Sequence, residues 1–329
     1  MRPEALVRRL VRGLATLPVV FTAVFLSLSF VSNPNTSRTF SYAPRHPTVV
    51  VSRLPRFAAR EASLPALYGR WAGRLLQFDF GRMPGEAAAS VSGVVVDSLG
   101  FTAVYFLPAV VIALLAGTAV QLYAVATETR LDWWTRLVAV VAVSVPVFLL
   151  AYFARTTLLV AVAEPLDLNF LAFRFEVARG PLAPENLRMM VFPFVATTVY
   201  LTAIQMRYAG SELNEHAERP FVKVARAKGA GPLRVGWHIL PHTVVHLATA
   251  FFTDMLGMVL VGIYVVEWLT LVPGFGALTI DAVGARVPGL VFAVVLLPVT
   301  LAVGVNLVQD LYYALIDPRV DDDGSGVGE

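Results

Sequence analysis

Long runs of apolar residues alternate with polar connections along most of this chain. Six runs stand out, roughly over residues 14–31, 101–123, 137–153, 189–204, 244–268 and 290–315. A helix needs about 20 consecutive, mostly apolar residues to cross the hydrocarbon core of a bilayer. The pattern therefore predicts an all-α fold, a polytopic membrane helix bundle with six transmembrane helices.

Most of these runs contain a proline in their interior: Pro18, Pro108, Pro146, Pro193 and Pro298. Helices of soluble proteins rarely tolerate proline there, but bundled membrane helices do, because neighbouring groups satisfy the freed carbonyl oxygens. The prolines fit a membrane bundle without indicating which kind.

Composition supports this class of protein. The chain is 57% hydrophobic and 15% charged, with a mean hydropathy of +0.68, which is too apolar for a soluble domain. The chain has no cysteine, which excludes disulfides, thiolate catalysis and zinc-thiolate sites. Its net charge of +3 gives no reason to expect nucleic acid as a partner. The expected surroundings are a lipid bilayer.

Basic residues indicate the orientation. Arg2, Arg8, Arg9 and Arg12 precede the first run, so the N-terminus is expected in the cytoplasm, and six crossings bring the C-terminus there too. The loop at residues 210–240 then also lies inside. A cleaved signal peptide is the competing interpretation of residues 1–31, but the apolar run is long for one. The long loop at residues 32–98 lies outside, and its residues 63–79 are expected to form an amphipathic helix on the membrane or against the bundle.

A short basic segment, "FVKVARAKGAGPLRVGWHILP", interrupts the apolar pattern at residues 221–241 and holds both lysines of the chain. Its first eight residues predict a two-turn helix that Pro220 begins and a left-handed Gly229 ends. Phe221, Val224 and Ala225 are expected on one face, with Lys223 and Arg226 opposite. Such a helix either lies on anionic lipid or docks a cytoplasmic partner.

Three motifs favour docking, because in order and spacing they resemble one family. "VKVARAKGAGPLRVGWHILP" is similar to the cytoplasmic EAA loop of ABC-importer permeases, and "ARAKG" is typical of the dipeptide, oligopeptide and nickel permeases. "VVEWLTLVPGFGALTIDAV" at 265–283 and "VNLVQDLYYALIDPRV" at 305–320 resemble the family's later signatures. Lys223 stands where the general motif has glutamate.

The resemblance implies a type I ABC-importer permease fold in the cytoplasmic membrane. It divides the chain into a first helix with its outer loop (1–98), a permease core (99–320) whose coupling loop spans about 208–240, and an acidic tail (321–329). It implies three kinds of partner: a second permease subunit, two cytoplasmic ATP-binding subunits and an extracytoplasmic solute-binding protein. The transported solutes would be peptides or similar small molecules.

The same resemblance assigns the candidate residues. The ATPase-coupling loop comprises Phe221, Lys223, Val224, Ala225, Arg226, Lys228 and Gly229. Glu267, Pro273, Gly274 and Gly276 match the later motif and are candidates for the translocation pathway or gate. Asp254 joins them because a carboxylate within an apolar run should face the protein interior or a water-filled cavity. Its alternative is a structural hydrogen bond to a neighbouring helix.

The chain is not expected to be an enzyme or to hold a cofactor or a metal. It has no Gly-x-x-x-x-Gly-Lys-Ser/Thr phosphate loop, so ATP hydrolysis would take place on partner subunits. The alternative function is a membrane-embedded metal-dependent enzyme, since His238, His242 and His246 are spaced to share a helical face with Asp254. A membrane scaffold without transport is the third hypothesis.

Overall fold

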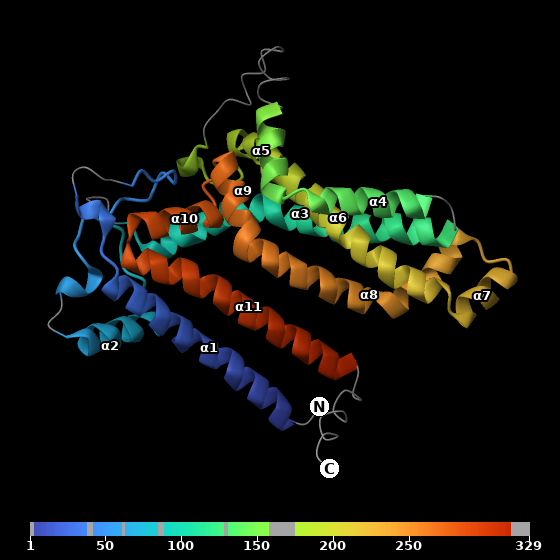
Figure 1. Ribbon diagram of the computed structural model, residues 1–329, viewed down its shortest axis with the longest axis horizontal. Helices are drawn as coiled ribbons and strands as arrows, with labels where there is room; N and C mark the ends of the chain where they lie inside the picture. Colours follow the sequence, from blue (N-terminus) through green and yellow to red (C-terminus); the bar gives the residue numbers. More distant parts are fainter. Residues whose placement is uncertain are drawn as a thin grey trace. The chain divides into compact units, whose positions relative to one another are not determined.

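The computed structural model of this chain describes residues 3–37, 42–60, 63–84, 89–127, 131–157 and 175–316 (Figure 1). Regular structure in these ranges is helical, apart from an isolated β-bridge between Arg82 and Ser90. The predicted all-α class is therefore confirmed. The acidic tail at residues 321–329 lies outside the described residues.

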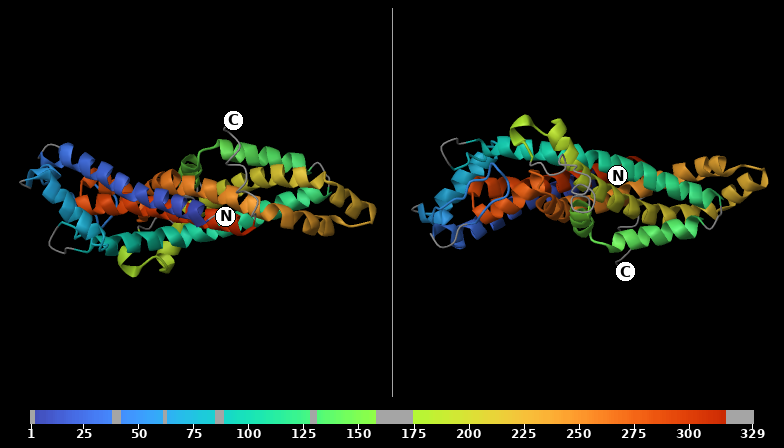
Figure 2. Two further views of the ribbon diagram at one scale, coloured as in Figure 1. Left: turned by 90° about the horizontal axis from the view of Figure 1, so that it is seen from below. Right: turned by 90° about the horizontal axis from the view of Figure 1, so that it is seen from above.

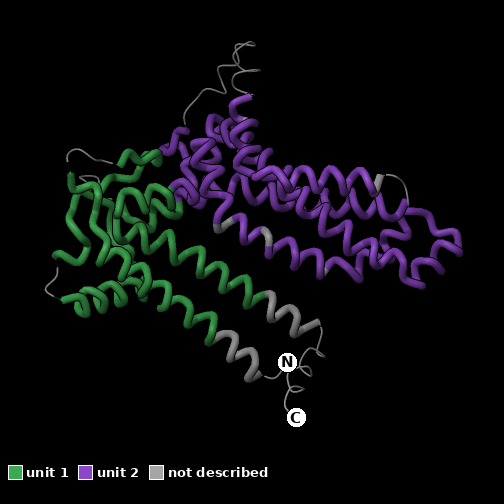
Figure 3. Tube along the Cα trace, viewed as in Figure 1, with its two compact units in different colours: residues 1–96, 278–329 green, residues 97–277 purple. Residues whose placement is uncertain are grey.

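The chain divides into two compact units, which Figure 3 colours separately. Unit 1 comprises residues 1–96 and 278–329, and unit 2 comprises residues 97–277. The sequence predicted a boundary at residue 98 but kept the C-terminal helix with the core. In the structure the C-terminal segment groups with the N-terminal one, because their helices pack together.

Unit 1 is built on two long helices, α1 (Pro3–Phe30) and α11 (Pro288–Ile316), which lie side by side in Figures 1 and 2. The expected amphipathic helix is α2 (Leu64–Leu75), preceded by Ser63 at its N-cap. Its apolar face joins a cluster of aromatic rings with α1, α11 and the connecting loop: Phe21, Phe25, Phe57, Tyr68, Trp71 and Phe292. Phe78, within the range expected to be helical, lies beyond the helix and is 79% exposed.

The loop after α1 is fastened to α10 (Phe275–Ala285) by polar contacts within unit 1. Asp281 accepts hydrogen bonds from the Tyr42 hydroxyl (2.7 Å) and the His46 backbone N–H, and the Asn35 amide donates to the Gly284 carbonyl (3.0 Å). Burial and the bond to Asp281 raise the pKa of the Tyr42 hydroxyl above its ordinary value, so it stays a donor.

Unit 2 contains the other helices of the described chain. They are most of α3 (Val91–Thr127), then α4 (Leu131–Ser144), α5 (Val147–Thr157), α6 (Pro184–Ala217), α7 (Pro220–Ala227), α8 (Pro232–Gly257) and α9 (Ile263–Thr270). A π-helical segment, Met258–Gly262, joins α8 to α9.

Buried amides link α3, α4 and α6, a device that holds helices together where water is absent. The Gln121 amide donates to the Met206 carbonyl (3.1 Å) and accepts from the Thr135 hydroxyl (2.9 Å). The Gln205 amide donates to the Thr118 hydroxyl at 2.7 Å.

Four continuous helical segments are long and apolar enough to cross a membrane: Val11–Thr36, Val91–Thr127, Pro184–Ala217 and Pro288–Val308. Three bent pairs qualify only when each is taken as one broken span. The predicted third run breaks between α4 and α5 with an 85° bend, and Pro146 lies at that break. The predicted fifth run is interrupted by the π segment, whereas Pro18, Pro108, Pro193 and Pro298 lie within continuous helices.

Candidate functional site

The short basic helix predicted at residues 221–228 is α7, and its termini are specified locally. Pro220 occupies the first turn, where a missing N–H costs nothing. At the other end Gly229 has φ +78°, as predicted. The Gly229 N–H donates to the Arg226 carbonyl (2.9 Å) and the Ala230 N–H to the Ala225 carbonyl (3.1 Å), which together form a Schellman motif. Glycine is favoured at this position because a residue with a Cβ atom is strained in the left-handed backbone conformation.

The buried face of α7 differs from the expected one. Val222 and Ala225, three residues apart, are buried in this chain, and Val222 packs in an apolar cluster with α3, α6 and α8. Phe221 and Val224 are exposed instead. The expected grouping of Phe221, Val224 and Ala225 is therefore wrong, since Ala225 turns inward and the other two turn outward. The helix presents apolar side chains to its surroundings.

The same loop carries cationic side chains. Lys223 and Lys228 are exposed, and Arg226 is half-buried. Arg219, just before α7, forms an exposed ion pair with Glu215 (3.4 Å). The outward surface of α7 thus combines apolar groups with positive charge.

The three histidines of α8 do not form a common site. The His242 ring lies against Phe221 of α7, with 5.0 Å between ring centroids, and His246 pairs with Glu212 of α6 at 3.2 Å. His238 is exposed. Among the residues that the structure describes, no three His, Asp or Glu side chains gather as a metal would require.

A second polar site surrounds Glu267 at the turn between α9 and α10. Its carboxyl group is fully buried and accepts four hydrogen bonds, two on each oxygen. Oε1 accepts from the hydroxyls of Thr102 (2.6 Å) and Tyr105 (2.9 Å), and Oε2 accepts from the backbone N–H groups of Gly276 (2.7 Å) and Ala277 (3.1 Å). All four lone-pair positions of the carboxylate are therefore used.

The Glu267 carboxyl group caps the N-terminus of α10. The first N–H groups of α10 have no partner within the helix, and Glu267 satisfies two of them from outside. A third, from Phe275, donates to the Thr102 hydroxyl at 2.8 Å. The arrangement ties the start of α10 to α9 and α3, and we call Thr102, Tyr105, Glu267, Gly276 and Ala277 the Glu267 node.

The two glycines of the "PGFG" motif are required by close packing. A Cβ atom on Gly274 would collide with the Glu267 carboxyl group, and one on Gly276 would lie 2.7 Å from the Tyr264 Cα atom. Leu271, which ends α9 in the left-handed conformation (φ +61°), turns the chain toward them. Sequence reasoning found Glu267 and the glycines but missed Thr102 and Tyr105. Two hydroxyl residues one turn apart on an apolar helix were the available signal.

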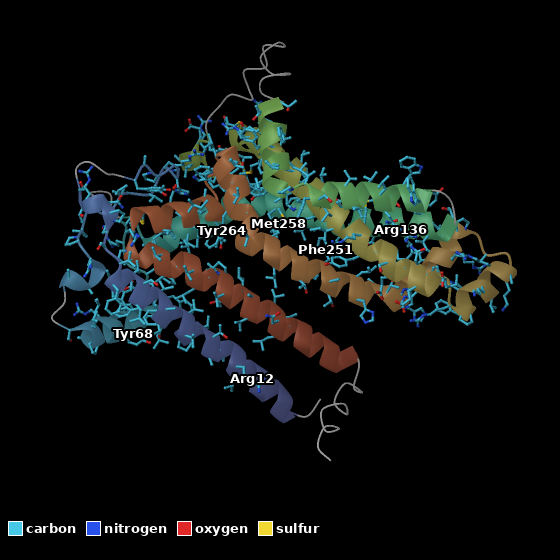
Figure 4. The ribbon with its side chains drawn as sticks, in the orientation of Figure 1. Arg12, Tyr68, Arg136, Phe251, Met258 and Tyr264 are labelled. Atoms are coloured by element: carbon cyan, nitrogen blue, oxygen red, sulfur yellow. The ribbon has the colours of Figure 1, made fainter. Side chains whose placement is uncertain are left out.

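A cavity of about 380 Å³ lies in unit 2 between the α4–α5 break and the π-helical segment. Pro146 and its neighbours line it at the α4–α5 break, and Met258, Val261 and Gly262 of the π segment line it from the other side. Figure 4 labels Met258 together with Phe251 of α8 and Tyr264 of α9. Broken helices are common at transport sites, and the α4–α5 break is such an interruption beside a cavity.

The residues predicted for a pathway or gate lie in different places. Glu267 and Gly276 belong to the Glu267 node, Gly274 packs against its carboxyl group and Pro273 is buried next to it in the chain, and none of the four lines this cavity. Asp254 belongs to α8, three residues before its end, and its side chain lies outside the part that the structure describes. The structure thus joins four of these five residues in one structural unit.

A broken apolar helix with a cavity beside it and a cationic loop with exposed apolar residues fit a polytopic membrane transport subunit. Comparison with known families agrees. Residues 109–322, more than half of the chain, match the family of inner membrane components of binding-protein-dependent transport systems, and the chain belongs to this family.

Individual relatives cover most of the chain. It is 27% identical to the dipeptide transport system permease protein of Bacillus subtilis over 75% of this chain and 76% of the relative. It is 25% identical to the oligopeptide transport system permease protein of the same organism, over 77% and 79%. It is 22% identical to the metal-staphylopine import system permease protein of Staphylococcus aureus, over 92% and 94%.

The chain is therefore an ABC importer permease subunit, a multi-pass inner membrane protein that is not itself an enzyme. Such a permease works with ATPase and solute-binding partners, on which ATP hydrolysis and solute capture take place. The metal-dependent enzyme that the histidine spacing left open is not supported.

Proposed function

We propose that this permease imports peptides or similar small solutes, and that α7 is the helix through which a cytoplasmic ATPase drives it. The exposure of Phe221 and Val224 on a helix that is otherwise well anchored supports this most directly. Exposed apolar groups on a short, rigidly capped helix suit a groove on a protein partner, and the cations beside them suit an acidic rim.

The solute class rests on the relatives. Permeases named for dipeptides and oligopeptides resemble this chain over three quarters of its length, and another is named for a metal-staphylopine complex. The cavity at the helix breaks is lined largely by apolar residues and includes Arg207. Alternating access would change the packing around these breaks when the ATPase moves α7.

The proposed assembly contains a second permease subunit, two ATP-binding subunits and one solute-binding protein. In it, this chain crosses the membrane six times with both termini in the cytoplasm. Gly229 and α7 then face the cytoplasm, while α2 and the long loop face outward. If a cysteine placed at Ser325 reacted only with an impermeant reagent added from outside, this orientation would be wrong.

The docking role is tested by two glycines that differ in one property. A Cβ atom added to either Gly229 or Gly231 would meet no other atom within 4 Å, but only Gly229 has a positive φ. Gly229→Val should unwind the C-terminal cap of α7 and abolish both ATPase co-purification and uptake. Gly231→Val, the matched control, should retain both.

Lys223→Gln separates docking from lipid attachment. A charge at the rim of an interface contributes little, so this variant should keep most ATPase binding and transport. A helix that merely lies on anionic lipid predicts the reverse order, with charge loss harmful and Gly229→Val tolerated. That reverse order, measured in membranes by co-purification and solute uptake, would overturn the proposal.

A further inference from the structure

Unit 1 contains an arginine-lined cavity of about 330 Å³. Its cations come from α2, from the segment after α2 and from the α10–α11 connection: Arg70, Arg74, Arg82 and Arg286. No Asp or Glu within the described ranges lines it. Asp79 lies nearby, and its hydrogen bond with Arg74 (2.9 Å) lowers the pKa of the Asp79 carboxyl group, so this pair stays ionised. Among the described residues, the lining of the cavity therefore carries more positive than negative charge.

An apolar groove of about 320 Å³ adjoins this cavity. Ala23, Val24 and Ser27 of α1 line one side of it, with Val283 and Val291 on the other. The Ser27 hydroxyl donates to the Ala23 carbonyl of its own helix (2.9 Å), which leaves the groove surface apolar. Leu28, Val31 and Arg286 line both hollows, so the two are adjacent.

Arg286 stands at the junction in a strained backbone conformation. It follows the last residue of α10 with φ +57°, a position at which glycine is the unstrained choice. Within the described chain its guanidinium group makes one long hydrogen bond, 3.5 Å to the Ser32 carbonyl. A strained arginine that contributes so little to internal bonding is a reason to look for a ligand.

We propose that unit 1 binds one anionic phospholipid, with its phosphate group among these arginines and an acyl chain in the groove. Guanidinium groups suit phosphate oxygens because they offer several N–H donors in a fixed plane. The groove follows α1 and α11, both apolar enough to cross a membrane, so an acyl chain is the apolar group available there. Trp71 beside the cavity suits the headgroup level.

An acidic protein surface would match the charge but leave the groove unexplained. The proposal does not depend on the role given to α7.

The test uses the full chain, purified and depleted of lipid, with native mass spectrometry of added lipids. Dioleoyl phosphatidylglycerol should bind as one molecule per chain and at least tenfold more tightly than dioleoyl phosphatidylcholine. Arg286→Gly should weaken phosphatidylglycerol binding about tenfold while the thermal midpoint stays the same or rises, because glycine relieves the strain. Arg53→Gln removes a positive charge outside both hollows and should bind phosphatidylglycerol as the wild type does.

A second variant and a free anion identify the bound group. Val283→Trp should fill the groove and weaken phosphatidylglycerol binding as well. If inorganic phosphate displaced the lipid at millimolar concentration while Val283→Trp had no effect, the cavity would be a free-anion site and the proposal would be wrong. Equal binding of the two lipids would also overturn it. So would an Arg286→Gly variant that binds phosphatidylglycerol normally but loses the solute-binding protein, since that identifies a protein-docking surface.

Discussion

The Glu267 node and α7 both depart from the usual rule that apolar side chains are buried and charged ones exposed, but in opposite directions. At the node a glutamate has no exposed surface. On α7 a valine, Val224, is 53% exposed although a neighbouring valine is fully buried. Each inversion has a local physical reason, and the two reasons separate what holds this permease together from what it presents to partners.

At the node the polar group is inside because the backbone needs it there. The chain ends α9 and begins α10 within a few residues, which leaves N–H groups without helical partners. Bulk solvent does not reach this buried site, and a carboxyl group with a neighbouring hydroxyl accepts these N–H groups instead. On α7 the Schellman motif satisfies carbonyl groups at the C-terminus of the helix from its own backbone, and the exposed apolar groups of α7 take no part in it. Their exposure is the observation on which the proposed docking role rests.

The largest effect should come from removing the node's carboxyl group. Glu267→Ala leaves four donors without their acceptor and should destabilise the protein by about 4 kcal/mol. Glu267→Gln should cost clearly less, because the amide oxygen can accept from Gly276 and Ala277 while its NH₂ group donates to the Thr102 and Tyr105 oxygens. Unfolding in mixed micelles measures both variants. Equal losses for the two would mean that these hydrogen bonds do not hold the turn.

Much of this architecture could be predicted from the sequence. Apolar runs gave the helical class and most of the long helices, since the bilayer length requirement acts on composition alone. Pro220 at the start of α7 and Gly229 just after its end predicted both ends of that helix, because each residue type acts through its own backbone. Where local chemistry decides the structure, as at Gly229, the prediction was accurate.

Other features depend on contacts between distant segments. Thr102 precedes Glu267 by 165 residues along the chain, so no local pattern links them. The inward turn of Ala225 follows from packing of Val222 against three other helices, which the two-turn sequence does not contain. The break at Pro146 could not be distinguished from the continuous helices around the other prolines, since all five are prolines in apolar runs.

The two valines of α7 test the other half of the comparison, with a smaller effect on stability. Val222→Ser removes a buried side chain and should lower stability by about 2 kcal/mol, while Val224→Ser, at an exposed position, should change it by less than about 0.5 kcal/mol. If α7 docks an ATPase, Val224→Ser should nevertheless weaken ATPase binding about tenfold, or about 1.4 kcal/mol, because an apolar contact at an interface is lost.

Thermal unfolding of the permease and titration with the ATPase measure the two quantities separately. A Val224→Ser variant that binds the ATPase like the wild type would leave the exposed valine without a function. A variant that lost both stability and binding would show that Val224 belongs to the interior of the protein, and the contrast between α7 and the Glu267 node would fail.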